Sequence, residues 1–205
     1  MIPEYSVEPK SRKDLRQLAD ALREMFHLED KVYFPIVQLL DVLPEYIPDF
    51  TYEIVDDDEF DKNVHADTDI VHNHIRIKES VYIGADDGNG RDRMTIAHEV
   101  CHLVTLGVLG FRLQRNFSKE LKPYEDPEWQ AKCMAGELMV NKKLVEGLSA
   151  FDIEERCGVS FVAARKQYNA FKKEAKMWKL FRCKYRMSFS TGLRHSTKIS
   201  KLRAV

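Results

Sequence analysis

Helical spacing of apolar residues marks the first element of the chain. Ser11 is followed three positions later by Asp14, which is the arrangement of a capping box at a helix N-terminus. The apolar residues that then recur on one helix face are Leu15, Leu18, Leu22 and Met25. This pattern predicts an amphipathic helix over residues 12–26, followed by a short helix that begins at Pro35 and ends near Pro44.

Alternation of apolar and polar residues then replaces the helical spacing. Phe50, Tyr52 and Ile54 alternate as in a half-buried strand, and residues 71–77 and 80–83 have the composition of further strands. The run Asp-Asp-Gly-Asn-Gly comes next and is a strong turn signal. We therefore expect one small sheet that ends at this turn.

Residues 91–106 form a helical segment that is apolar on most sides, and Gly107 is placed to end it. A helix of this kind is buried rather than lying on the surface. The acidic and imidazole side chains that it contains beyond residue 93 are His98, Glu99 and His102. Polar groups on a buried helix are costly unless something binds them, so these residues are candidates for a functional site.

A long connection over residues 107–125 leads to the last predicted helices. Asp126 and Pro127 have the character of a cap and a first helical residue, which predicts a helix through about Val145. Two shorter helical pieces follow, over residues 153–157 and 161–171. The whole pattern predicts an α+β fold that is mainly helical and has a small sheet.

His98-Glu99-Val100-Cys101-His102 matches the HExxH pattern of zinc hydrolases. Because residues i and i+4 lie on one helix face, both imidazoles can reach a single ion. Glu99 is displaced by one residue around the helix and can hydrogen-bond to a water on the metal. Zinc lowers the pKa of that water towards about 7, so a carboxylate can take its proton as the oxygen attacks a carbonyl.

A catalytic zinc site needs a third protein ligand and an open position. Glu128, 26 residues after His102, is the best candidate, because the first turn of a helix favours an ionised carboxylate. The other acidic residues that could take this role are Glu125, Asp126 and Glu137. Tyr124 precedes the helix and is a candidate donor to the oxyanion or contact to the substrate.

The cysteines and the apolar segments of the sequence predict where the protein is located in the cell. The four cysteines are far apart and form no CxxC pair, which is typical of reduced thiols in a cytosol. The sequence has no apolar run of about eighteen residues, and its start lacks the layout of a secretory signal. We therefore expect a cytoplasmic protein that does not interact with a membrane.

The formal net charge of −1 conceals an uneven distribution. Residues 172–205 contain eleven Lys and Arg and one acidic residue, so this tail carries +10 and the preceding part carries −11. Basic segments with interleaved aromatic residues can bind nucleic acid directly. The interpretation favoured from sequence is instead an amphipathic helix that packs on the acidic body.

HExxH followed at this interval by the run from Glu128 to Met139 resembles the ImmA/IrrE family of metallopeptidases. In that family the second helix has the form E-x-x-A-x-x-F-A-x-E-L-L-x-P, and Thr95 here matches the family's T-x-x-H-E. The resemblance covers roughly residues 12–170. Three departures, none of which removes a ligand, are Cys101 for Gly, Met134 for Phe and Asn141 for Pro.

This resemblance implies a zincin-like metallopeptidase domain over residues 1–147, a small helical extension over 148–171 and a basic tail over 172–205. It implies about one zinc per chain, with Glu128 completing the ligand set of His98 and His102, and with Glu99 as the base. Characterised members of the family cut helix-turn-helix repressors, which implies such a repressor as substrate and partner. The alternative is a metal-containing regulatory or toxin-like binding protein that sequesters a partner, and the intact Glu99 favours the protease.

Overall fold

The computed structural model describes the backbone of residues 7–108 and 122–191 and the side chains of residues 7–106 and 122–180. The chain separates into two units, Met1–Gln167 and Tyr168–Val205, and each is described by itself. The domain boundaries implied by the family resemblance stay a prediction. None of the helices that the structure describes is long and apolar enough to cross a membrane.

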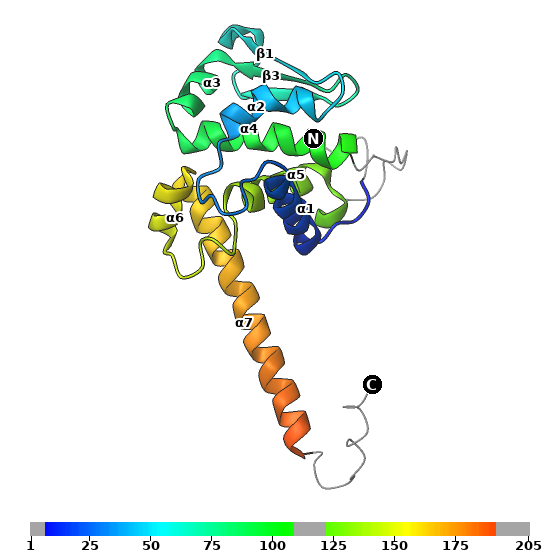
Figure 1. Cartoon of the computed structure of the whole chain (residues 1–205), viewed down its shortest axis with the longest axis vertical. Helices are drawn as coiled ribbons and strands as arrows, with labels where there is room; N and C mark the ends of the chain where they lie inside the picture. Colours follow the sequence, from blue (N-terminus) through cyan, green and yellow to red (C-terminus); the bar gives the residue numbers. More distant parts are fainter. Residues whose placement is uncertain (1–6, 109–121, 192–205) are drawn as a thin grey trace. The chain divides into compact units, whose positions relative to one another are not determined.

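A central helix, α4 (Gly90–His102), organises unit 1 (Figure 1). The sheet, α2 (Ile36–Val42) and α3 (Glu79–Asp86) lie on one side of it, and α5 (Pro127–Met139) and α1 (Arg12–Met25) lie on the other. The remaining elements are η1 (Leu43–Glu45), β1 (Thr51–Val55), η2 (Asp57–Glu59), β2 (Ala66–Asp69), β3 (His74–Lys78), the π-helical turn η3 (Leu103–Val108), η4 (Pro123–Glu125), α6 (Ala150–Cys157) and α7 (Phe161–Thr191). The prediction of a mainly helical α+β fold with a small sheet is confirmed.

The sheet has three strands in the order β1-β3-β2. β1 is parallel to β3, with Thr51 opposite His74, and β2 is antiparallel to β3, with Ala66 opposite Ile77. The central strand buries Ile75 and Ile77 completely. β2 has a strand neighbour on one side only, so its other backbone edge is unpaired in the described sheet.

Two features of the sheet region differ from the sequence prediction. Residues 80–83, predicted as strand material, belong to α3, because Val81 and Ala85 lie one helical turn apart and are both buried. β2 was not predicted, because its sequence Ala-Asp-Thr-Asp contains a single β-branched residue and no apolar alternation. Tertiary pairing with β3 therefore determines this strand more than its own composition does.

The helix predicted to run to about Val145 ends at Met139. Val140 leaves the helical region with φ −126° and ψ 86°. Asn141 then donates a side-chain hydrogen bond of 2.7 Å to the Asp20 carboxylate on α1. This contact ties the end of α5 to α1 and replaces the helical turn that the sequence pattern predicted.

Caps fix the starts of the two helices on which the candidate residues lie. Asn89 caps α4 by accepting a hydrogen bond of 2.9 Å from the backbone N–H of Arg91. Asp126 caps α5 in the same way, at 2.9 Å from the backbone N–H of Glu128, and Pro127 occupies the first turn. A cap of this type stabilises a helix by about 1 kcal/mol, so both starting points are well determined.

α4 and α5 are in contact, and each has apolar side chains in the core. α4 buries Ile96 and Val100 completely, and α5 does the same with Met134 and Leu138. A helix whose apolar side chains are close-packed in the core has little freedom to turn about its axis. The polar residues of both helices therefore hold fixed positions beside this interface.

Gly158, at the end of α6, is a position where the fold leaves no room for a side chain. It has a φ of 62°, and a Cβ there would lie 2.6 Å from a ring carbon of Tyr33. We expect Gly158→Ala to lower the free energy of unfolding by about 1–3 kcal/mol, measured by urea denaturation. Gly147→Ala is the matched control, because Gly147 also has a positive φ of 84° but nothing lies within 4 Å of its Cβ position. Equal losses in both variants would show that the Tyr33 contact has no effect.

Candidate active site

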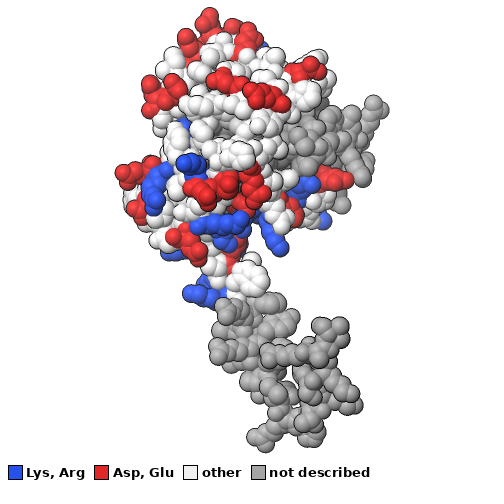
Figure 2. All heavy atoms as spheres, in the orientation of Figure 1, with Lys and Arg blue, Asp and Glu red and all other residues white. Residues whose placement is uncertain are grey.

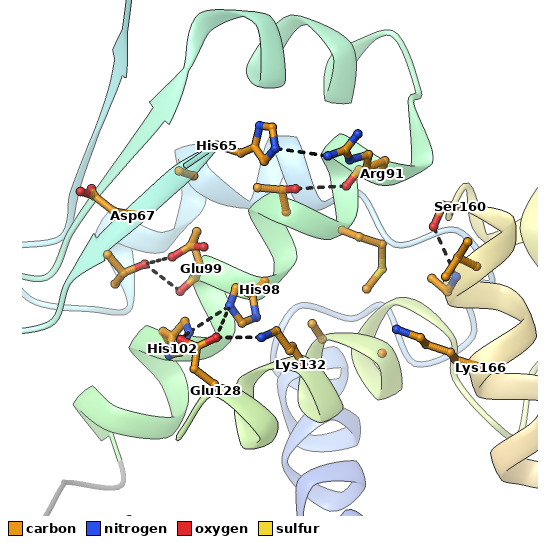
Figure 3. Close-up of a pocket in the computed structure, with 18 of the residues that line it drawn as sticks. His65, Asp67, Arg91, His98, Glu99, His102, Glu128, Lys132, Ser160 and Lys166 are labelled. Atoms are coloured by element: carbon orange, nitrogen blue, oxygen red, sulfur yellow. Dashed lines mark hydrogen bonds and ion pairs between the residues drawn. The ribbon is translucent and has the colours of Figure 1, made fainter. Parts of the chain in front are cut away.

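His98 and His102 lie in the last turn of α4, and their Nε2 atoms are 3.1 Å apart. Glu128 approaches them from the first turn of α5 (Figure 3). Its Oε1 atom is 3.1 Å from His102 Nε2, and its Oε2 atom is 3.4 Å from His98 Nε2. One ligand atom from each residue lies within 4.8 Å of the others, so this group could hold a metal ion.

The chemistry of these donors fits a divalent cation. Two imidazole nitrogens and a carboxylate oxygen are a donor set that zinc accepts, and three protein ligands leave a position free for water or substrate. His102 is buried, His98 is half-buried, and Glu128 is exposed, so the group opens to solvent on the side of Glu128. His98 Nδ1 is buried without a hydrogen-bond partner among the described residues, and the polar contacts of that ring to His102 and Glu128 are made through Nε2.

Glu128 is held in its charged form. Hydrogen bonds from His102 and then from His98 keep the pKa of this carboxyl well below its usual range. Lys132, one turn further along α5, adds an ion pair of 3.0 Å to Oε2. The i,i+4 spacing of Glu128 and Lys132, which favours an ion pair on a helix, is the signal in the sequence that points to this contact.

Glu99 lies beside the two histidines and Glu128, but unlike Glu128 it is buried. Burial raises the pKa of its carboxyl group above the usual range. Thr68, on β2, donates a hydrogen bond of 2.7 Å to Glu99 Oε2 (Figure 3). A carboxylate with a raised pKa and a fixed orientation is suited to accept a proton. The contact of Thr68 with Glu99 could not be predicted from the sequence, because Thr68 and Glu99 are 31 positions apart.

A cleft of roughly 1020 Å³ runs past these residues. Its wall includes β2 with Ala66, Asp67 and Thr68, the face of α4 with the histidines, one side of α5 from Glu128 to Gly136, and the start of α7. Lys166, on the part of α7 that belongs to unit 1, points into the cleft from the side opposite β2 (Figure 3). This volume is large enough for several residues of an extended peptide.

The acidic residues weighed against Glu128 lie elsewhere. Glu125 accepts a hydrogen bond from the backbone of Lys122, and Asp126 caps α5. Glu137 is completely buried, and its carboxylate pairs with two arginines of α1. Among the described residues, Glu128 is therefore the carboxylate that the fold groups with the two histidines.

Tyr124 lies in η4, before α5, and is exposed. Lys122 Nζ lies 5.7 Å from the centre of its ring, and the residues that line the cleft do not include Tyr124. The backbone carbonyl of Tyr124 accepts a hydrogen bond of 2.8 Å from the Gln130 amide. Its proposed contact with the oxyanion or substrate stays a prediction.

Comparison with known proteins gives the family. No curated protein and no solved structure matches the chain. The sequence model of the peptidase M78 family, described as the IrrE N-terminal-like domain, matches residues 60–169, which is more than half of the 205 residues. The matched region contains α4, α5 and the whole histidine and glutamate group. The resemblance noted in the sequence is thereby confirmed, and the chain belongs to the peptidase M78 family, a family of metallopeptidases.

Proposed function

We propose that this protein is a zinc-dependent endopeptidase in which His98, His102 and Glu128 hold the metal and Glu99 acts as the base. The observation that carries the proposal is the convergence of the three ligand atoms within 4.8 Å, beside a buried carboxylate on the same cleft. Membership in a metallopeptidase family supports the reaction class. Zinc is the metal that best suits two imidazoles and one carboxylate with an open position.

The protein side chains have separate tasks in this reaction. Zinc, when bound, would supply Lewis-acid polarisation of the peptide carbonyl and would increase the acidity of water. Glu99 takes a proton from a water molecule as the oxygen of that water bonds to the carbonyl carbon. Glu99 then returns the proton to the amide nitrogen as the C–N bond breaks. Thr68 keeps the Glu99 carboxylate oriented through its 2.7 Å hydrogen bond.

The free edge of β2 is suited to hold the substrate. An extended peptide can add to an unpaired strand edge through main-chain hydrogen bonds. Thr68, which positions Glu99, lies on this same strand and lines the cleft. A substrate strand along β2 would therefore pass close to the base and the metal ligands.

Binding of the metal can be tested without a substrate. We expect purified protein to contain about one zinc per chain, and His98→Ala to reduce this content to near zero, measured by elemental analysis. His72→Ala is the matched control, because His72 is exposed and pairs with Asp69 at 2.6 Å. Zinc that is retained in His98→Ala, or lost equally in both variants, would contradict the ligand assignment.

The substrate that we propose is a helix-turn-helix transcriptional repressor, whose cleavage would relieve repression. The resemblance to repressor-cleaving members of the ImmA/IrrE family supports this substrate class. The test is incubation of the purified protein with the helix-turn-helix regulators encoded beside its gene, with fragments identified by mass spectrometry. We expect a cut at a single peptide bond that is prevented by a zinc chelator and restored by added zinc.

The same incubation separates the protease from the alternative function. A regulator that stays intact but elutes together with the protein would support a binding protein that sequesters its partner. A regulator that neither binds nor is cut would contradict the proposed substrate class.

A further inference from the structure

Unit 2 differs from unit 1 in its charge. Residues 168–205 contain eleven Lys and Arg and one acidic residue, Glu174, which gives +10. The preceding 167 residues contain the other 21 basic and 32 acidic residues, which gives −11. In Figure 2, the part of unit 1 that holds the sheet and α3 shows mainly acidic side chains on the visible face. Unit 2 therefore has a net positive charge and unit 1 a net negative charge of similar size.

The lysines of the described part of unit 2 are not neutralised by acids. Lys173, Lys176 and Lys179 are exposed and have no carboxylate partner among the described residues. Several basic side chains of unit 1 are instead paired with acids, as in the ion pairs of Arg76 with Asp67, Lys132 with Glu128 and Lys143 with Asp20. Unpaired lysines in a row repel one another, and an external polyanion would relieve this repulsion.

The helix arranges three of these lysines on one face. Lys172, Lys176 and Lys179 have the spacing i, i+4 and i+7, so their side chains lie along one side of α7 over about 10 Å. Lys172 Nζ lies 4.3 Å from the centre of the Tyr168 ring. Glu174 points to the opposite side of the helix, because two residues correspond to a rotation of about 200° from Lys172. The row of cations is therefore free of acidic side chains on its own face.

Among the described side chains of unit 2, the exposed apolar residues do not form a single face. Met177, Trp178 and Leu180 are exposed by 59%, 65% and 63%. At about 100° per residue, Trp178 points about 100° away from Met177 and about 160° away from Leu180. A helix that lies in a membrane surface, or packs on an apolar groove, needs its apolar residues on one side. This interspersed pattern is instead typical of a surface that contacts phosphates with lysines and bases with an aromatic ring.

We propose that unit 2 is a nucleic-acid-binding segment that recognises the phosphate backbone through the row Lys172, Lys176 and Lys179. Contacts of this kind are independent of base sequence and weaken as salt increases. The negative charge of unit 1 repels the same ligand, so binding is confined to unit 2. This binding does not depend on the proposed proteolysis, since none of these residues belongs to the cleft.

The test uses the full chain and a fluorescently labelled 20-base-pair duplex and 20-base single strand, with binding measured by fluorescence anisotropy between about 50 and 200 mM KCl. The variant Lys172→Gln/Lys176→Gln/Lys179→Gln is compared with Lys13→Gln/Lys31→Gln/Lys62→Gln, which removes the same charge from exposed lysines of unit 1. We expect the first variant to bind at least about tenfold more weakly. Its slope of log affinity against log salt should be smaller by about 2–3. The second variant should stay within about twofold of the wild type.

Three outcomes would overturn the proposal. One is no binding of either oligonucleotide by the wild type at about 50 mM KCl. Another is an equal loss in both triple variants, which would mean that net charge alone acts. The last is binding to vesicles that contain phosphatidylserine but not to the oligonucleotides, which would identify a membrane surface as the ligand. A preference for the single strand that is lost in Trp178→Ala would support the proposal and identify base stacking as part of the contact.

Discussion

Replacing Glu99 by Gln is expected to lower the rate of peptide cleavage by about 10²–10⁴-fold, the usual contribution of a positioned base. The amide of Gln has nearly the shape of the carboxylate, and it can still accept the hydrogen bond from Thr68. It cannot accept a proton from water at neutral pH. The rate should be measured with the regulator that the wild-type protein cuts, at saturating substrate, by quantifying the fragments over time.

Zinc content separates loss of the base from loss of the metal. We expect Glu99→Gln to keep about one zinc per chain, because its side chain is not among the three grouped ligands. Glu155→Gln is the matched control, since Glu155 is exposed and lies in α6 outside the cleft. Cleavage by Glu99→Gln at the wild-type rate would remove Glu99 from the mechanism.

Replacing Glu137 by Ala is expected to lower the free energy of unfolding by about 3–5 kcal/mol, because it removes the carboxylate that neutralises two arginines in a poorly solvated position. The Glu137 side chain is completely buried. Its carboxylate accepts hydrogen bonds from Arg12 Nε at 2.5 Å and from Arg16 Nε at 2.6 Å. These contacts join α1 to α5, on which Glu128 lies. Urea denaturation followed by circular dichroism should show a lower midpoint with an unchanged slope.

Two further variants show whether the loss of charge neutralisation causes the lower stability. Glu146→Ala removes an exposed glutamate that follows α5 and should change stability by less than about 0.5 kcal/mol. The triple variant Arg12→Met/Arg16→Met/Glu137→Leu replaces the whole group by apolar side chains and should recover most of the stability. A triple variant as unstable as Glu137→Ala would mean that lost packing, rather than the loss of charge neutralisation, is the cause.

Local signals in the sequence predicted the helices around the site. The capping box of Ser11 and Asp14 and the Asp126-Pro127 start are contained within a few residues, and both appear in the structure. The i,i+4 spacing of His98 and His102 places both imidazoles on one helix face without knowledge of the fold. For this reason the candidate ligands could be identified before the tertiary structure was considered.

Contacts between distant parts of the chain could not be predicted in this way. Arg12 and Glu137 are 125 positions apart, and Thr68 and Glu99 are 31 apart. Each partner is an ordinary residue in its local sequence, and only the folded backbone brings the pairs together. The wrong prediction for residues 80–83 has the same origin, because Val-Tyr-Ile favours a strand while burial against neighbouring elements selects a helix.

The unpaired edge of β2 also bears on the solubility of the protein. An open strand edge is a template on which further copies of a chain can aggregate. β2 has four residues, and two of them, Asp67 and Asp69, are aspartates. A strand this short offers few main-chain hydrogen bonds to another copy of the chain. The carboxylates of two such edges would also face each other and repel. Lengthening β2 with apolar residues would therefore promote self-association of the protein through the same edge that we propose for the substrate.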